Sequence, residues 1–360
     1  MRSIISTSAL AALLASGAVQ AGGLDRSGQD TSIILKEGGL FEVTSISVKP
    51  TVSGTNADLG AGTSATGDVA PDYSMTTMAL RADINDSMAV AFIQDNPYGA
   101  DVSWTNGGLI NTAGTVESDA TTLLLSYNVN DAMTVYGGLK NQSVNVSATV
   151  PAASYTLTGS ESSASGYVMG AAFEKPEIAM RVALTYHTKI KHSMAIAETV
   201  GGAAVPASSM SFSTPSAFNL DFQTGIAANT LLFGSIRKAN WTQTIVKPTN
   251  YPLVTLLDYD NDTTVYSIGL GRKLNDQWSV AATYGWEKAS GGDGGPFSPT
   301  DGNSNYGLGA TYTADQLSVT VGARKVSFGD QSAVKAAGTT FASMSDNTGM
   351  VTAVKLAYKF

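Results

Sequence analysis

The chain has 360 residues, a formal net charge of −8 and no cysteine. The negative charge argues against nucleic acid as a partner, and the lack of cysteine excludes a disulfide framework and thiol chemistry. Hydrophobic residues make up 43% of the chain, which suits a soluble domain as well as a barrel that turns every second residue toward lipid. The pattern along the chain must therefore decide between these classes.

Residues 1–21 are typical of a secretory signal peptide. Arg2 supplies a positive start, residues 4–19 form an apolar stretch rich in small residues, and residues 19–21 form a small-x-small cleavage site. The stretch is short and rich in serine and alanine, which disfavours a transmembrane anchor. We expect the mature chain to begin at Gly22, after transport across the inner membrane.

From residue 39 to residue 360, alternating segments are joined by long and short connectors in turn. The long polar connectors lie near 53–71, 104–117, 147–162, 190–212, 241–262, 288–303 and 328–346. The short turns lie near 85–87, 128–132, 174–177, 227–229, 275–277 and 313–316. Seven long and six short connectors predict about fourteen strands, the layout of an outer-membrane barrel with short periplasmic turns and long outer loops.

The strands themselves are predicted from period-two alternation. The last one, 346–360, places Leu356, Tyr358 and Phe360 on one face and Lys355 on the other. Its terminal aromatic residue resembles the C-terminal signature of bacterial outer-membrane barrels. The other expected strands are approximately 39–52, 72–84, 88–104, 118–128, 132–146, 163–174, 180–187, 212–226, 229–240, 262–274, 277–288, 306–312 and 317–324.

Two kinds of β protein show this alternation of side chains between two faces. In 277–288, Trp278 and Trp286 fall on one face near opposite ends of the strand, as two membrane interfaces favour, and Thr283 falls on the other. A soluble sandwich would instead place large apolar residues inside, whereas the inner face here is small, polar or charged. The predicted fold class is all-β: a transmembrane antiparallel β-barrel of about 14 strands over 39–360. Near 231–233 the alternation is ambiguous, so Arg237 is not assigned to a face.

The third expected strand, 88–104, is too long to be regular, and Pro97 lies near its middle. Proline cannot donate to the ladder, so in a closed barrel it must lie at a bulge or a break. Gly99 adds permissive backbone angles two residues later. The alternative is that 95–99 is a plain turn, which would spoil the alternation of long and short connectors. We therefore favour a kink that opens the wall sideways.

Several segments carry a family resemblance. They are residues 22–29, residues 95–100, and Ser213-Thr214-Pro215 followed by 222–226 and Asn240-Trp241. These segments resemble the FadL family of outer-membrane transporters for long-chain fatty acids and other hydrophobic compounds. The resemblance implies an N-terminal hatch inside a fourteen-stranded barrel, here 22–38, and a kinked third strand. It also implies a lateral exit with a wall formed by Asn96, Pro97, Tyr98 and Gly99. The family's hatch often carries an Asn-Pro-Ala motif and is longer, so this chain departs from the pattern and its lumen could stay partly open.

Three inward cations are the other candidate binding residues. Lys140, Arg324 and Lys355 fall near mid-strand on the inward parity, where they could bind a carboxylate head group or simply be solvated or paired with acidic residues. The two histidines, His187 and His192, have no partner at ligand spacing. No catalytic set can be assembled, so we expect no enzyme, no metal and no cofactor.

The sequence thus predicts a Gram-negative outer-membrane channel for passive uptake of hydrophobic molecules, long-chain fatty acids or similar compounds, with lateral exit at the kink. The alternatives are a general porin for small hydrophilic solutes and a structural or adhesive barrel. Few charges and many apolar or small residues in the loops favour apolar capture. The expected partners are hydrophobic small molecules, outer-membrane lipid and lipopolysaccharide, and the barrel assembly machinery, with the chain acting as a monomer.

Overall fold

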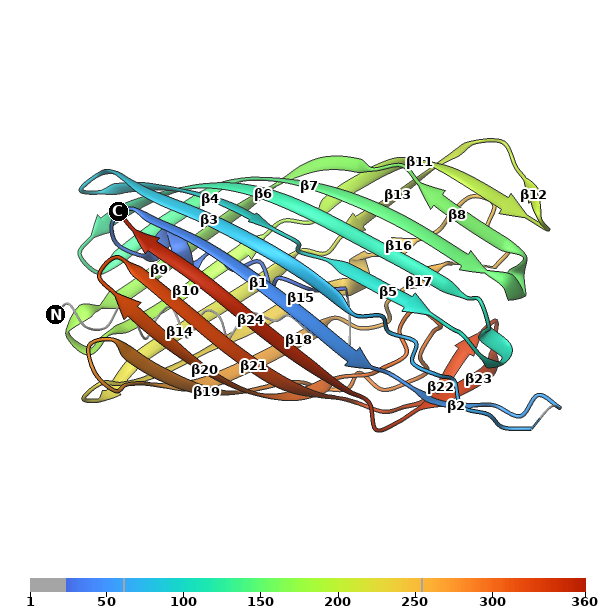
Figure 1. The fold of residues 1–360 in the computed structure, drawn as a ribbon. Helices are drawn as coiled ribbons and strands as arrows, with labels where there is room; N and C mark the ends of the chain where they lie inside the picture. Colours follow the sequence, from blue (N-terminus) through green and yellow to red (C-terminus); the bar gives the residue numbers. More distant parts are fainter. Residues whose placement is uncertain (1–23, 61, 254) are drawn as a thin grey trace.

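The computed structural model describes residues 24–60, 62–253 and 255–360. The predicted signal peptide and the expected mature start at Gly22 lie outside the described residues. The chain forms a closed barrel of 14 antiparallel strands, which confirms the predicted fold class (Figure 1). β1 (Leu40–Thr51) and β24 (Thr348–Lys359) pair along their lengths and close the barrel. The C-terminus lies at the end that carries the short turns.

Most predicted strand boundaries agree with the structure within a few residues. The other barrel strands are β3 (Tyr73–Asn85), β4 (Met88–Asp95) continued by β5 (Gly99–Ser103), β6 (Ala113–Asn130), β7 (Met133–Val150), β9 (Ser162–Lys175), β10 (Met180–His187) continued by β11 (Ile190–Val200), β13 (Ser208–Thr214) continued by β14 (Ala217–Ala227), β15 (Thr230–Ala239), β18 (Thr263–Lys273), β19 (Trp278–Glu287), β20 (Asn303–Ala314) and β21 (Leu317–Phe328).

The long connectors are more ordered than the sequence predicts. They contain β2 (Gly54–Asn56), β8 (Tyr155–Gly159), β12 (Ala203–Ala204), β16 (Ile245–Val246), β17 (Leu257–Asp258), β22 (Gln331–Ala336) and β23 (Thr339–Met344). The 3₁₀ helices are η1 (Ser32–Leu35), η2 (Gly107–Leu109), η3 (Pro151–Ala153), η4 (Pro176–Ile178) and η5 (Trp241–Gln243). The expectation of a loop over 190–212 was wrong, because the alternation continues there in small and polar residues and Met194, Ile196 and Met210 pack inward.

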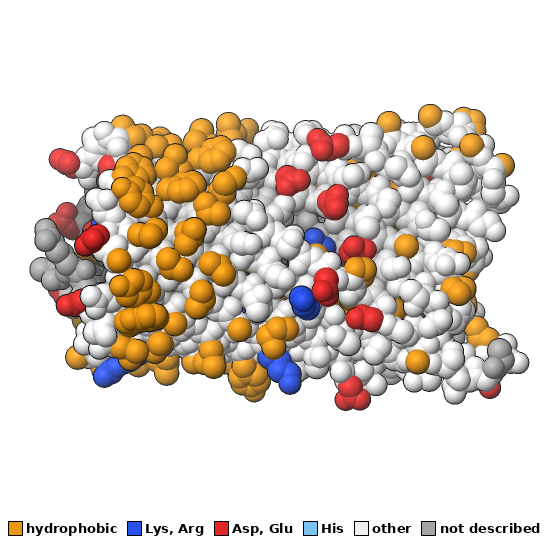
Figure 2. All heavy atoms as spheres, in the orientation of Figure 1, with side chains coloured by type: hydrophobic (Ala, Val, Ile, Leu, Met, Phe, Trp, Pro, Cys, Tyr) orange, Lys and Arg blue, Asp and Glu red, His pale blue; other side chains and the backbone are white. Residues whose placement is uncertain are grey.

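The outer face divides the barrel into two zones. Hydrophobic side chains gather in a band around the half that carries the short turns, and the other half is mostly polar on the face shown in Figure 2. On β6 the outward residues change from Leu125 and Leu123 to Asp119 and Glu117 as the strand leaves the band. Short turns are periplasmic in such barrels, so the apolar band marks the membrane and the polar half extends outward. Among the described residues, no helix has the length and apolar character to span a bilayer.

Aromatic residues mark the edges of this band, as the sequence predicts for 277–288. On β19, Trp278 lies at the turn end and Trp286 at the outer end, and both are exposed. Trp286 stacks on Tyr266 with ring centroids 4.9 Å apart, and Trp278 contacts Tyr312 at 5.0 Å. Such rings have an apolar body and a polar tip, which suits the membrane interface.

Candidate functional site: the third-strand gap and the N-terminal segment

The third strand is broken. β4 and β5 both pair with β6, so they are two halves of one strand, and residues 95–99 form a kink instead of a turn. Asp95 pairs with Ala120 and Gly99 pairs with Glu117. The broken strand therefore takes four residue steps (95 to 99) where β6 takes three (117 to 120), which is the count of a bulge with one extra residue. Pro97, which has no backbone N–H, lies inside this extra length.

The break leaves a gap in the barrel wall between β3 and β5, which we call the wall gap. Pairing of β3 with β4 ends at Met78 and Gln94, and residues 73–77 pair with β1 on their other side. Among the described residues, no ladder joins β5 to β3. Beyond the gap, the Ser103 N–H donates to the Val69 carbonyl at 2.9 Å. The wall gap is therefore bounded at both ends and has a limited height.

The N-terminal segment (residues 24–38) lies against the inner side of this gap. Asp25 and Tyr98 form an antiparallel bridge, the Arg26 N–H donates to the Pro97 carbonyl at 2.9 Å, and the Gly99 N–H donates to the Leu24 carbonyl at 2.7 Å. These bonds satisfy backbone groups that the kink removes from the β3–β4 ladder. The segment crosses the lumen, because Asn219 on β14 donates to the Gly28 carbonyl and Arg181 on β10 donates to the Leu35 carbonyl.

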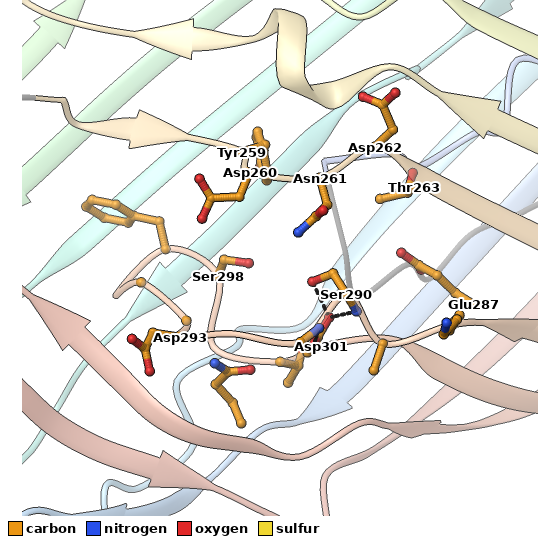
Figure 3. A pocket seen from close by; sticks show the side chains of 18 of the residues that line it. Tyr259, Asp260, Asn261, Asp262, Thr263, Glu287, Ser290, Asp293, Ser298 and Asp301 are labelled. Carbon is orange, nitrogen blue, oxygen red and sulfur yellow. Dashed lines mark hydrogen bonds between the residues drawn. The ribbon is translucent and has the colours of Figure 1, made fainter.

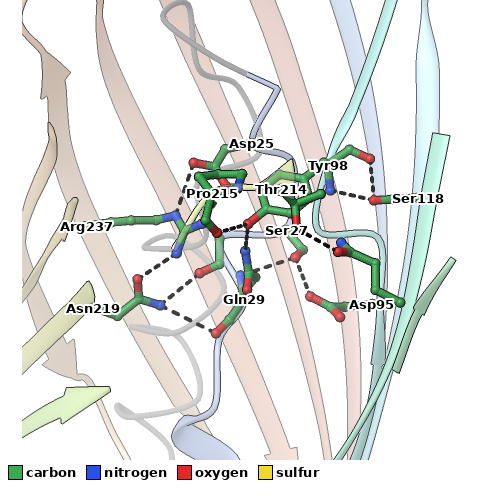
Figure 4. A network of polar contacts seen from close by, with 12 residues as sticks. Asp25, Ser27, Gln29, Asp95, Tyr98, Ser118, Thr214, Pro215, Asn219 and Arg237 are labelled. Carbon is green, nitrogen blue, oxygen red and sulfur yellow. Dashed lines mark hydrogen bonds and ion pairs between the residues drawn. The ribbon is translucent and has the colours of Figure 1, made fainter. Parts of the chain in front are cut away.

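A buried polar network fixes the segment (Figure 4). Arg237 on β15 forms a two-pronged ion pair with Asp25, with Nη2–Oδ1 and Nε–Oδ2 distances of 2.6 and 3.2 Å. Arg237 also donates to Asn219 at 2.8 Å, and the hydroxyl of Ser27 donates to the carboxylate of Asp95 on β4. Arg237, whose face the sequence left open, thus points inward. A fork-shaped arginine–carboxylate pair fixes geometry more firmly than a single contact.

The lumen cations are already engaged. All three point inward, with exposed fractions of 4% for Lys140, 8% for Arg324 and 5% for Lys355. Lys140 donates to the side-chain oxygen of Gln29 at 2.6 Å, and Lys355 forms an ion pair with Glu42 at 2.9 Å. Lys355 pairs across the sheet with Thr320, and Arg324 pairs with Val351. The three residues therefore belong to separate clusters and do not converge on one head group.

Glu42 on β1 connects the second cluster to the N-terminal segment. Lys36 donates to Glu42 at 2.7 Å, so this carboxylate is shared by Lys36 and Lys355. Burial lowers the pKa of Lys36, and the charge of Glu42 opposes that shift. The segment is thus attached at its start through Asp25 and at its end through Lys36.

Arg26 occupies the wall gap itself. Its guanidinium lies over the ring of Tyr73 on β3, 4.0 Å from the centroid, within cation–π distance. A Cβ placed on Gly99 would come within 2.4 Å of the Arg26 Nε, so glycine at this position makes room for the guanidinium. Burial lowers the pKa of Arg26, while Tyr73, Asp101 and Glu117 act in the opposite direction.

Two cavities lead to this point from the outer end. The outer one has a volume of about 780 Å³ and lies among the connectors after β15 and β19 (Figure 3). Its lining carries six acidic residues and one lysine: Asp258, Asp260, Asp262, Glu287, Asp293, Asp301 and Lys288. The inner one has a volume of about 120 Å³ and is lined by Arg26, Tyr73, Gly99 and Asp101 among others. Tyr259 and Phe297 line both cavities, so they adjoin.

A third, small apolar cavity of about 50 Å³ lies beside the inner one. Its lining includes Leu24, Val102, Leu157, Leu256 and Phe297, with no charged side chain. Leu24, Val102 and Phe297 also line the inner cavity. The route from the outer end to the wall gap is therefore acidic at its mouth, has an apolar cavity beside it further in, and is lined by Arg26 and Asp101 at the gap itself.

The predicted exit residues have divided roles. Tyr98 is buried and points inward, where its ring contacts Trp241 at 5.4 Å and its hydroxyl accepts from Gln29 at 2.8 Å. Asn96 donates to the outward Asp119 at 2.7 Å. Sequence reasoning did not identify Asp25 or Arg26 as site residues, although both lie in the family-like segment 22–29. Tyr73 carries no signal beyond an aromatic residue at a strand start.

His187 and His192 belong to different strands and surroundings. His187 on β10 is buried, and His192 on β11 contacts the Ser162 carbonyl at 3.1 Å and stacks on Phe212. Within the described residues, no group of three His, Cys, Asp or Glu side chains is arranged to hold a metal ion.

Residues 33–360 match the family model described as outer membrane protein transport protein (OMPP1/FadL/TodX). Among solved structures, a Pseudomonas aeruginosa FadL homologue is similar with a TM-score of 0.77 and 16% identity, covering 99% of this chain and 98% of that one. The Pseudomonas putida toluene transporter TodX has a TM-score of 0.65 at 13% identity, covering 90% and 91%. The Ralstonia pickettii toluene transporter TbuX has a TM-score of 0.64 at 10% identity, covering 97% and 98%. A comparison with curated protein sequences finds no match.

Proposed function

Because this chain belongs to the outer membrane protein transport protein family (OMPP1/FadL/TodX), we propose that it carries hydrophobic molecules passively through the barrel to a lateral exit at the wall gap. Cargo would enter the outer cavity, pass the inner cavity and the small apolar cavity beside Leu24 and Phe297, and leave between β3 and β5. In this proposal residues 24–38 serve as a hatch, which would extend to Gly22 in the mature chain. We propose no enzymatic activity, because the family is one of transport proteins.

The observation that carries the proposal is the coincidence of the wall gap with the inner cavity. The same residues, Tyr73, Gly99 and Asp101, line the cavity and border the gap. Straight passage toward the periplasm is opposed by the N-terminal segment, which is held to β15 by Asp25 and to β1 by Lys36. The same obstruction disfavours the general-porin alternative, which needs an open polar lumen.

The cargo is drawn from two candidate classes. Long-chain fatty acids are what the FadL resemblance suggests, and neutral apolar compounds are the second class. The acidic lining of the outer cavity repels carboxylates, and Lys140 and Lys355 are engaged with the protein. These observations favour neutral apolar cargo over free fatty acids. The solved toluene transporters to which the fold is similar are consistent with this preference.

Other partners follow from the membrane location. We propose that the outer aromatic edge around Trp286 contacts lipid and lipopolysaccharide, and that the barrel assembly machinery inserts the chain. We also propose that the chain acts as a monomer, since each strand of the described barrel finds its neighbours within one chain and no second chain is needed to close it.

Deleting Pro97 tests the lateral exit. Removing one residue restores equal counts between β4–β5 and β6, so Asn96 would stay outward and Tyr98 inward while the ladder closes against β3. Uptake of a neutral fluorescent apolar probe into proteoliposomes should fall about tenfold or more, with thermal stability kept or raised. Deleting Gly202, in an exposed turn of an outer connector, is the matched control. Unchanged uptake in a correctly folded Pro97 deletion would show that cargo leaves by another route.

A further inference from the structure

The wall gap does not open into the middle of the apolar band. Beside it, the outward residues of β3 are Ser74 and Thr76. The apolar Met78 and Leu80 follow only on the side of the gap toward the short turns. On the other side, Asp119 and Glu117 of β6 face outward at the level of the kink. The gap is therefore rimmed by polar side chains at the outer edge of the band, where lipid head groups lie.

Among the described residues, the side chain of Arg26 fills this polar-rimmed opening. Arg26 starts from the N-terminal segment inside the barrel, stacks on Tyr73 at one border and packs against Gly99 at the other. Asp101 and Glu117 provide negative charge around it, and Glu117 is an outward, exposed residue. The guanidinium thus lies in the thickness of the wall, between the inner cavity and the head-group region.

The backbone of this segment is fixed on both sides of Arg26. Asp25 is held by the buried pair with Arg237, and Ser27 is held by Asp95 and by its N–H bond to the Asn96 carbonyl at 3.2 Å. The Arg26 N–H is itself bonded to Pro97. The Arg26 side chain has several rotatable bonds and is held by its contact with the Tyr73 ring. Within the described residues it forms no ion pair like that of Arg237 with Asp25, so it can swing without movement of the segment's backbone.

We propose that the Arg26 side chain is the gate of the wall gap: stacked on Tyr73 it closes the opening, and by swinging away it opens the inner cavity toward the head-group region without any movement of the barrel strands. This role rests on the proposed lateral exit and adds the element that controls it. Gly99 serves this gate because the absence of a side chain leaves the space in which the guanidinium lies.

Cysteine labelling tests the gate directly, because the chain has no native cysteine. The reporter is Ala100→Cys, at a position that lines the inner cavity. The probe is a phospholipid with a maleimide on its head group, incorporated in the proteoliposome membrane, so that it reaches the thiol sideways through the wall. Thr121→Cys, which is outward and exposed on β6, should react rapidly in every variant and reports correct insertion.

Arg26→Ala should raise the labelling rate of the Ala100→Cys reporter at least tenfold. Tyr73→Leu, which leaves Arg26 present but removes the ring on which it stacks, should raise the rate by a smaller factor. Arg272→Ala, an exposed arginine near a short turn, is the matched control and should leave the rate unchanged. If Arg26→Ala did not fold, Tyr73→Leu would carry the same test, because it keeps the N-terminal segment intact.

Two results would overturn the gate. One is a rate in Arg26→Ala equal to that of the unaltered background, and the other is a background rate as fast as that of Thr121→Cys. Uptake measured on the same variants separates this proposal from the one on which it rests. Faster labelling without any change in uptake would keep the gate and reject lateral exit as the route of transport.

Discussion

The barrel wall is built in two different ways on its two sides. From β18 to β21, neighbouring strands pair almost continuously, and the outer surface carries stacked aromatic rings such as Tyr266 and Trp286. Around β4 and β5, one strand is broken, one side lacks its ladder, and an inner segment supplies the missing backbone bonds. The same alternation rule operates on both sides, so the difference arises from one extra residue next to Pro97.

The two sides of the barrel obtain their stability from different contacts. The regular wall is held by ladder hydrogen bonds and cross-strand side-chain pairs, which are local and numerous. The broken wall depends on a few buried charged contacts to residues far away in sequence, such as Asp25 to Arg237. If the proposed lateral exit is correct, a wall of the second kind opens without unfolding the barrel, because few ladder hydrogen bonds cross it.

The largest effect is expected at the anchor of the broken wall. Asp25→Ala leaves Arg237 buried without its carboxylate, which should cost about 3–5 kcal/mol of unfolding free energy, measured by urea titration in detergent. Changing both partners, Asp25→Ala with Arg237→Met, removes the unpaired charge and should recover more than half of that loss. A double variant as unstable as Asp25→Ala alone would contradict this account.

The second contact that holds the N-terminal segment is the carboxylate of Glu42, which Lys36 and Lys355 share. Glu42→Gln keeps the shape but removes the carboxylate charge that Lys36 and Lys355 both contact, so we expect a loss of about 3 kcal/mol in the free energy of unfolding. The matched control is Glu174→Gln, whose pair with Arg181 is more exposed and should contribute about 1 kcal/mol or less. In Glu42→Gln the N-terminal segment should also be cleaved by protease faster than the barrel strands are. A purely global loss of barrel stability would not make this segment more sensitive than the rest.

In the regular wall, each contact should contribute less. A double-mutant cycle on Tyr266→Leu and Trp286→Leu should give a coupling of roughly 0.5–1.5 kcal/mol, because the two rings stack. Trp286 and Tyr312 lie toward opposite edges of the band, so their cycle should be additive within about 0.5 kcal/mol. A coupling between Tyr266 and Trp286 as large as that of the buried ion pair would remove the contrast between the two walls.

The regular wall is also the part that sequence reasoning predicts best. Strand 277–288 and its outward Trp278 and Trp286 are confirmed, because local alternation alone determines which face meets lipid. The kink at Pro97 could likewise be predicted, since proline cannot donate a backbone hydrogen bond wherever it lies in a ladder. The faces of this strand and the position of the kink depend on residues that are neighbours in sequence, so an alternating pattern is enough to predict them.

The site itself could be predicted only in part. Lys140 and Lys355 were placed on the correct face, but their partners Gln29 and Glu42 come from elsewhere in the chain, and only the register of a closed barrel brings them together. Arg26 gave no signal, because its position depends on the N-terminal segment pairing with the kink. The outer connectors were predicted as loops because the residues of their strands are mostly polar or small, as loop residues are.

The smallest predicted effect concerns the charge at the mouth of the route. Asp258 and Asp260 line the outer cavity and face solvent, so the double change to Asn should reduce repulsion of anions approaching from outside. Uptake of a long-chain fatty acid should rise roughly two- to fivefold at low salt, and the gain should shrink at 0.5 M salt because exposed charges are then screened. The methyl ester of the same acid carries no charge, so its uptake should not change. The control is Asp86→Asn with Asp131→Asn, which makes the same change in net charge at short turns on the opposite end of the barrel. If acid and ester responded equally, the acidic mouth would have no part in selecting cargo, and the preference for neutral molecules would have to arise in the apolar cavity beside Phe297.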